Sequence, residues 1–154
     1  MIELRAVGTV RSPRVEPLDD NWGGVISRIE LDPAQFTAEA LQGLDAFSHL
    51  EVVYFFHRVP EEKIEKVARH PRNRTDWPKV GIFAQRGKNR PNRLGVSVCR
   101  LIGCEGTTVT VEGLDAIEGT PVLDIKPWMN EFGPRGETMQ AEWATELMAE
   151  YYKG

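Results

Sequence analysis

The chain has 154 residues, of which 41% are hydrophobic and 27% charged, and its formal net charge is −4. This length and composition predict one globular domain, residues 1–154, and argue against intrinsic disorder. No run of about 20 apolar residues is present to cross a bilayer, and Glu3 with no apolar stretch behind it argues against a signal peptide. Two cysteines do not make a disulfide framework. A cytoplasmic protein is therefore expected.

The charge is distributed unevenly. Residues 69–100 hold nine basic side chains and one acid, Asp76, so this window carries +8 and leaves −12 for the rest of a chain whose total is −4. One basic block in an acidic protein predicts a single local surface for an anionic ligand, unlike a general nucleic-acid coat. The alternative is that the excess pairs with acids elsewhere, such as Glu142 and Glu146.

Seven strand-like segments are separated by turn signals. They cover residues 4–10, 25–31, 50–57, 80–84, 95–102, 107–111 and 119–125. Short helices are expected at 34–44 and 61–68. An amphipathic helix at about 137–152 places Met139, Trp143, Leu147 and Tyr151 on one stripe. Because the strands do not alternate with long helices, the pattern predicts a mainly β fold, an antiparallel barrel or sandwich.

Several common catalytic signatures are absent from the sequence. No Gly-x-Gly-x-x-Gly or P-loop pattern is present, which removes the usual Rossmann site for NAD or S-adenosylmethionine. There is no Gly-x-Ser-x-Gly elbow, and the three histidines lack metal-ligand spacing, so no metal site is expected. Cys99 and Cys104 are expected to be structural.

Two polar loops, residues 86–95 and 112–121, are more elaborate than simple connections. The first places four basic side chains within eight residues. Such charges repel one another unless an anion binds among them. The alternative is that both loops are solvated turns.

Motifs spread in order over residues 5–128 give the chain a resemblance to a known family. They are VGTVRSP at 7–13, GLDAFSHL at 43–50, FFH at 55–57, GIFAQR at 81–86 with RPN at 90–92, and LD at 114–115 followed by GTPVLDIKP at 119–127. Together they resemble the TsaA-like, or TrmO, family of tRNA adenine-N6 methyltransferases. The resemblance implies a small antiparallel β-barrel that binds S-adenosylmethionine and works as a homodimer, with the cofactor site near the subunit interface. The tRNA members methylate N6 of a threonylcarbamoyl-modified adenosine beside the anticodon.

The resemblance also implies which residues bind the cofactor. By position in the motifs these are Asp20, Asn21, Trp22, His57, Arg58, Arg86, Val96, Glu112, Gly113, Leu114 and Asp115. An arginine suits the methionine carboxylate, and an acid suits the ribose hydroxyls. Residues 20–22 stand where the family more usually has Pro-Arg-Gln, so this part of the match is by position alone.

Substrate binding is expected of the basic loop. Its candidate residues are Lys88, Arg90, Asn92 and Arg93. The accepting nitrogen of a carbamoyl-adenosine is amide-like and has to lose a proton. Asp124 or Asp115 is therefore expected as the base, and Lys126 or Arg90 as the stabilising cation.

Two departures from the family pattern leave alternatives open. Arg93 replaces a proline, and longer members carry a C-terminal domain that these 154 residues do not include. If that domain holds tRNA, this chain is expected to bind RNA weakly or to act on something else. Three functions therefore remain: a tRNA methyltransferase, a barrel that binds S-adenosylmethionine or RNA without turnover, and a methyltransferase for a small molecule.

Overall fold

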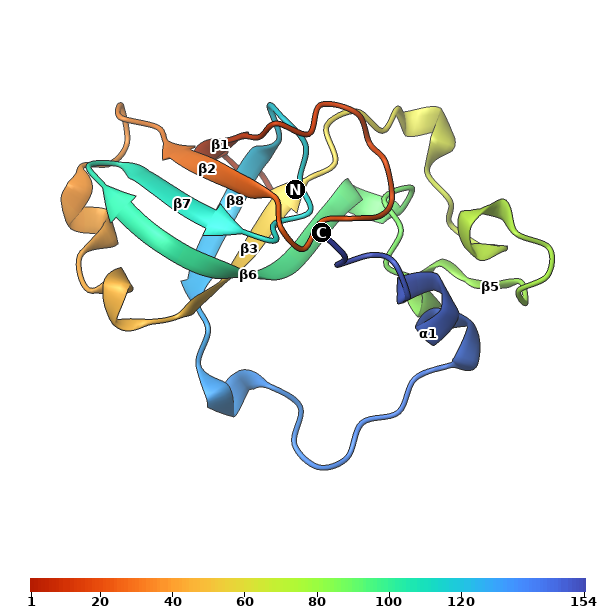
Figure 1. The fold of residues 1–154 in the computed structure, drawn as a ribbon. Coiled ribbons are helices and arrows are strands. Elements are labelled where there is room, and N and C mark those ends of the chain that lie inside the picture. The colour runs from red at the N-terminus through yellow and green to blue at the C-terminus, as the bar shows by residue number, and fades with distance from the viewer.

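Six antiparallel strands close into a barrel in the computed structural model, which describes residues 1–154 (Figure 1). Around the barrel the order is β1-β2-β7-β6-β3-β8. The strands are β1 (Gly8–Arg11), β2 (Ile26–Leu31), β3 (His49–Phe55), β6 (Leu94–Glu105), β7 (Thr108–Glu112) and β8 (Pro121–Pro127). A separate two-stranded sheet pairs β4 (Ala68–Arg69) with β5 (Val80–Gly81). The mainly β fold with a barrel is confirmed.

The barrel interior is filled by the alternate side chains of each strand. In β3, the side chains of Leu50, Val52 and Tyr54 point inward and are buried. Similar positions on the other strands complete one core, whose buried members are Val10, Ile29, Leu31, Leu50, Val52, Tyr54, Cys99, Val109, Val111, Leu114, Ala116 and Val122. Burial of these β-branched, aliphatic and aromatic groups is the main free-energy gain of folding.

The two ends of the barrel differ in the length of their connections. Because every neighbouring pair is antiparallel, the connections 12–25, 56–93 and 113–120 all leave one end, which we call the long-loop end. Residues 32–48 and 106–107 connect strands at the opposite, turn end. Residues 128–141 then carry the chain back from the turn end toward the long-loop end, where the C-terminal residues lie (Figure 1).

The helical segments are shorter than predicted. In place of helices at 34–44 and 61–68 the chain forms single 3-10 turns at Ala38–Leu41, Leu44–Ala46 and Glu61–Lys63. Further 3-10 turns lie at Pro71–Asn73, Ile82–Ala84, Pro91–Arg93 and Asn130–Phe132. None of these seven turns has a side-chain N-cap, and a helix without caps or a well-buried face rarely propagates in water.

The C-terminal helix is confirmed, but α1 covers only Glu142–Met148. Gly133, Pro134 and Gly136 interrupt the segment before it, so Met139 lies outside the helix and is 95% exposed. No helix in the structure is both long enough and apolar enough to cross a membrane.

Candidate functional site

The centre of the candidate site is Asp115, just after β7 at the long-loop end. The Tyr54 hydroxyl on β3 donates to Asp115 Oδ1 over 3.1 Å, and the Ser97 hydroxyl on β6 donates to the same oxygen. Tyr151, from the C-terminal segment, donates to Asp115 Oδ2. Burial, followed by the Asp115 charge, raises the pKa of both tyrosines, so they remain protonated hydrogen-bond donors. One carboxylate thus gathers three separate parts of the chain.

The residues that precede Asp115 explain why it points into the site. Gly113 has φ +85°, a left-handed conformation that favours glycine, and its amide donates to Val25 O over 2.9 Å. Leu114 is fully buried in the barrel core. Glu112, at the end of β7, turns outward and pairs with Arg100 at 3.2 Å. Among the predicted cofactor residues 112–115, Asp115 is therefore the one whose charged side chain faces the other site residues.

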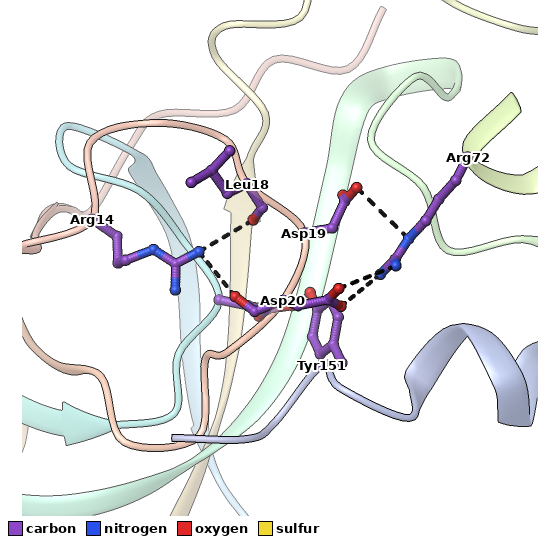
Figure 2. A network of polar contacts seen from close by, with 7 residues as sticks. Arg14, Leu18, Asp19, Asp20, Arg72 and Tyr151 are labelled. Carbon is purple, nitrogen blue, oxygen red and sulfur yellow. Dashed lines mark hydrogen bonds and ion pairs between the residues drawn. The ribbon is translucent and has the colours of Figure 1, made fainter.

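The loop containing Asp20, Asn21 and Trp22 lies beside Asp115 because the C-terminal segment contacts both. The amides of Asn21 and Trp22 donate to Glu150 O (3.1 Å) and Tyr151 O (2.8 Å). Trp22 is buried, with the Arg14 guanidinium 3.9 Å from its ring centroid. Arg14 also donates to the carbonyls of Leu18 and Asp20 in this loop (Figure 2).

An ion pair connects this loop to the basic window of residues 69–100. Arg72 lies 3.0 Å from Asp20 Oδ1 and 3.7 Å from Asp19 Oδ2 (Figure 2). Arg72 itself has φ +52°, a backbone conformation that costs energy outside glycine. Arg14, Arg72 and Tyr151 also lie beside the site, and the sequence does not predict this, because the motifs contain no signal for contacts this far apart in the chain.

Two other predicted cofactor residues are in direct contact. The Arg86 guanidinium donates to Val96 O over 2.8 Å, which fixes it beside the start of β6. Burial, followed by the Asp115 charge, raises the pKa of Tyr152 to about 12, and the Arg86 charge opposes this shift. Tyr152 therefore lies within electrostatic reach of both Asp115 and Arg86.

His57 and Arg58 lie on the same end of the barrel, at its rim. A Cβ placed on Gly119 would lie 3.7 Å from His57 Nε2, which puts His57 beside the 113–120 connection. Burial, followed by the charge of Arg58, lowers the pKa of His57. Arg58 donates to Val15 O over 3.0 Å and lies 3.9 Å from Glu16, so it holds the 12–25 connection.

The basic side chains of the predicted substrate loop differ in their contacts: two bind backbone carbonyls of the protein, and one has no partner. Arg90 donates to Gln85 O over 2.6 Å, and Arg93 donates to Val59 O over 2.8 Å while its guanidinium lies over the Phe55 ring. Asn92 adopts φ +62° in the turn between them. The side chain of Lys88 makes no hydrogen bond or ion pair, although its carbonyl accepts the Arg90 amide over 2.9 Å.

Five of the nine basic residues in the 69–100 window have no carboxylate partner within 4.0 Å. These five are Arg69, Lys79, Arg86, Lys88 and Arg90. Neither Glu142 nor Glu146 forms an ion pair with a basic residue of the window; Glu146 instead accepts a hydrogen bond from Nε1 of Trp77, an uncharged residue of the window. The excess positive charge therefore stays available to an anion.

The predicted catalytic pair lies apart from these residues. Lys126 and Asp124 form an ion pair with each other at 3.1 Å on β8, and Asp124 also accepts a hydrogen bond from the Ile125 amide. Asp124 lines a cavity of about 380 Å³ at the turn end, with apolar neighbours that include Leu31 and Phe36. The structure does not bring this pair into contact with any predicted cofactor residue.

Comparison with known proteins identifies the family. Residues 12–133 match the model of the tRNA-methyltransferase O N-terminal domain. The chain belongs to the TrmO family. A probable S-adenosyl-L-methionine-binding protein of Pyrococcus abyssi is 34% identical over 148 residues, which cover 93% of this chain and 76% of that protein. The human tRNA (adenine(37)-N6)-methyltransferase is 35% identical over 133 residues, which cover 86% of this chain and 29% of the human protein.

The crystal structure of TrmO from Pseudomonas aeruginosa has the same fold. It superimposes with a TM-score of 0.73 at 28% identity, covering 92% of this chain and 62% of the other. The resemblance read from the motifs is thus confirmed, and this is a family of S-adenosylmethionine-dependent methyltransferases.

The site residues fit the TrmO-family cofactor by their chemistry. A carboxylate can accept about four hydrogen bonds, and Asp115 accepts three from hydroxyl groups. The Arg86 guanidinium is exposed and has no carboxylate partner, as a binding site for a carboxylate requires. An anion-binding group and a hydroxyl-binding group therefore face the same end of the barrel.

Proposed function

We propose that this protein is an S-adenosylmethionine-dependent methyltransferase that methylates N6 of adenosine in tRNA, on the threonylcarbamoyl-modified nucleoside beside the anticodon. The observation that carries the proposal is the convergence of Asp115, Arg86 and the 20–22 loop at one end of a TrmO-family barrel. The five unpaired cations of the 69–100 window all lie in the 56–93 connection, which belongs to the same end.

The cofactor residues act by binding and orientation. When bound, S-adenosylmethionine supplies a methyl group activated by its sulfonium. Asp115 is placed to accept hydrogen bonds from ribose hydroxyls, and Arg86 to hold the methionine carboxylate. When both ends of the cofactor are fixed, the entropy of orienting it is lost on binding and not in the reaction step. This can lower the activation free energy by on the order of 7–11 kcal/mol at best.

The acceptor nitrogen has to lose a proton, and a carboxylate near the cofactor residues is the expected base. Asp115 lies among those residues, but the hydroxyls of Tyr54 and Ser97 and those of the ribose fill its acceptor positions, so its placement favours binding over the role of base. Asp124 and Lys126 gain no support as base and cation from their placement, because they pair with each other and Asp124 faces the turn-end cavity.

We also propose that the protein is a homodimer. The outer face of β6 exposes the apolar side chains of Leu94, Val96 and Val98, which are 36–41% exposed, and, beyond Arg100 on the same face, Ile102 at 45%. Contiguous apolar surface of this kind is typical of a protein interface. Because Val96 also holds Arg86, a partner on this face would lie beside the cofactor residues.

The test of the function is methyl transfer to tRNA. Purified protein is incubated with S-adenosylmethionine and total tRNA, and the digested nucleosides are analysed by mass spectrometry for a methyl group on N6 of threonylcarbamoyladenosine. Arg86→Ala is expected to weaken cofactor binding by about 1.5–3 kcal/mol, the value of a charge-assisted contact. A melting curve of the variant controls for the lost bond to Val96.

The alternatives give different results in the same experiment. A protein that binds the cofactor but leaves every tRNA nucleoside unchanged is a binding module or acts on a small molecule. Methylation of a cell extract depleted of RNA separates these two. Unchanged cofactor affinity in Arg86→Ala contradicts the role given to Arg86.

A further inference from the structure

The last residues of the chain pack directly on the 20–24 loop. We define residues 150–153 as the closing segment. Three amides of the loop, those of Asn21, Trp22 and Gly23, donate to closing-segment carbonyls at 3.1, 2.8 and 3.3 Å. The segment therefore occupies the backbone donors of a loop that the proposed function gives to the cofactor.

The close approach is encoded in the sequence of the loop. A Cβ placed on Gly23 would lie 1.9 Å from the Tyr152 carbonyl oxygen, which no side chain tolerates. Gly23 has an ordinary negative φ, so its backbone does not itself require glycine. The position is glycine-dependent because the closing segment lies against it.

Tyr151 extends the contact to the centre of the site. Its hydroxyl donates to Asp115 Oδ2, while Tyr54 and Ser97 both use Oδ1. With about four acceptor positions on a carboxylate, these three donors leave one position free. A ribose presents two neighbouring hydroxyls, so Asp115 can accept both only after Tyr151 has left.

The closing segment is attached so that it can leave without opening the barrel. Residues 128–141 are largely exposed, and the seven-residue α1 has no buried side chain. Trp143, Ala144 and Leu147 of the helix are half-buried, and Glu146 accepts a 2.7 Å hydrogen bond from Trp77 Nε1. The six-stranded barrel closes without the helix (Figure 1). Segments with few buried contacts are those that open locally.

We propose that the closing segment occupies the nucleoside end of the cofactor site, with Tyr151 in place of a ribose hydroxyl, and that S-adenosylmethionine binds by displacing it. The inference rests on the proposed function, because it names the residue that competes for that same site. Only molecules with an open segment then bind the cofactor, so the apparent dissociation constant is the intrinsic constant divided by the open fraction. Variants that release the segment bind the cofactor more tightly.

Two variants release the segment by independent routes. Tyr151→Phe keeps the ring and removes the donor to Asp115, and Gly23→Ala drives the Tyr152 carbonyl away without touching Asp115. Calorimetry with S-adenosylmethionine is expected to give a dissociation constant lower by roughly 10-fold in each, the equivalent of one hydrogen bond to a charged group. The matched controls are Thr145→Val, which removes from α1 an exposed hydroxyl bonded only to the exposed Gln140, and Gly103→Ala, which adds a Cβ with nothing within 4 Å.

Hydrogen exchange of the peptide covering 149–154 supplies a second measurement. Adding the cofactor to the wild-type protein is expected to speed amide exchange in this peptide, because the cofactor displaces the closing segment from the 20–24 loop. If exchange instead becomes slower and both variants bind the cofactor more weakly, the closing segment contributes to cofactor binding, and the proposal is overturned. Equal dissociation constants in all proteins overturn it too, but leave the proposed function intact. Failure of every protein to bind S-adenosylmethionine overturns the proposed function and this inference with it.

Discussion

Asp115 shows how a single residue organises the candidate site. It follows a left-handed glycine and a fully buried leucine, so its side chain is placed by the backbone before any ligand is present. The hydroxyls of Tyr54 and Ser97 then hold one of its oxygens. Groups held in this way lose little entropy when they bind a ligand, which is the advantage of a preorganised site.

His57 gives a pH prediction at the same scale. Its pKa is lowered in the folded protein, so between that pKa and the ordinary value of about 6.5 the unfolded chain binds more protons. The unfolding free energy contributed by His57 is therefore present above pH 6.5 and lost as the pH falls through this window. Urea unfolding from pH 8 to pH 5 is expected to show a smaller loss for His57→Gln than for the wild type. Parallel curves over the whole range contradict this prediction.

At the scale of the elements, β3 and β6 approach each other closely beside the site. A Cβ placed on Gly95 would lie 2.6 Å from the Tyr54 ring and 2.9 Å from Phe56. Glycine at this position leaves the room that the Tyr54 ring occupies opposite it on β6, and from there the Tyr54 hydroxyl reaches Asp115. The position of the donor thus depends on a missing side chain on the neighbouring strand.

Gly95→Ala is expected to destabilise the protein by about 1–3 kcal/mol, the cost of overpacking a filled core. Gly103→Ala on the same strand is the control, because nothing lies within 4 Å of its Cβ, and its unfolding free energy is expected to stay close to that of the wild type. Denaturant unfolding measures both. If the two variants lose the same stability, the cost comes from the strand backbone and the contact with Tyr54 is not its cause.

The six barrel strands could be predicted from the sequence far better than the helices and the contacts of the site, whereas the predicted strand 80–84 is strand only at Val80–Gly81, outside the barrel, and continues as a 3-10 turn. Alternating burial in β3 and β6 is a local pattern. The predicted ends of these two strands therefore differ from the observed ends by at most three residues. The stripe Trp143–Leu147–Tyr151 looked helical too, but Tyr151 leaves the helix to reach Asp115. Arg72 with Asp20, and Trp77 with Glu146, are 52 and 69 residues apart. No local pattern predicts pairs this distant.

At the scale of the whole molecule, the exposed row on β6 leads to the assembly prediction. A homodimer of this 17.4 kDa chain is expected in light scattering at micromolar concentration. Val98→Glu, which places a charge in the row, is expected to give particles of 17.4 kDa, because burying an unpaired carboxylate is costly. Val67→Glu, at a 76% exposed valine outside β6, serves as the control and keeps the dimer mass. A monomeric wild type contradicts the proposed interface.

The charge distribution over the molecule leads to a prediction about nucleic acid. Window 69–100 keeps five cations without carboxylate partners, more than one cofactor carboxylate can use. Arg90 is a poor probe, because its loss would also release the carbonyls that shape its loop. Lys79 and Lys88 make no such bonds. The double variant Lys79→Ala/Lys88→Ala therefore removes charge and leaves the loop intact.

Binding of tRNA by this double variant is measured across a range of salt concentrations. If both lysines contact phosphates, binding weakens and the slope of log K against log salt becomes shallower by up to about 0.9 per contact on duplex regions, or ~0.7 on single strands. Lys63→Ala/Lys66→Ala removes the same charge from exposed positions just before the window, and its slope is expected to match the wild type. Equal slopes for both double variants mean that the window acts only through the net charge of the protein. A loss of S-adenosylmethionine affinity in Lys79→Ala/Lys88→Ala instead assigns the two lysines to the cofactor site.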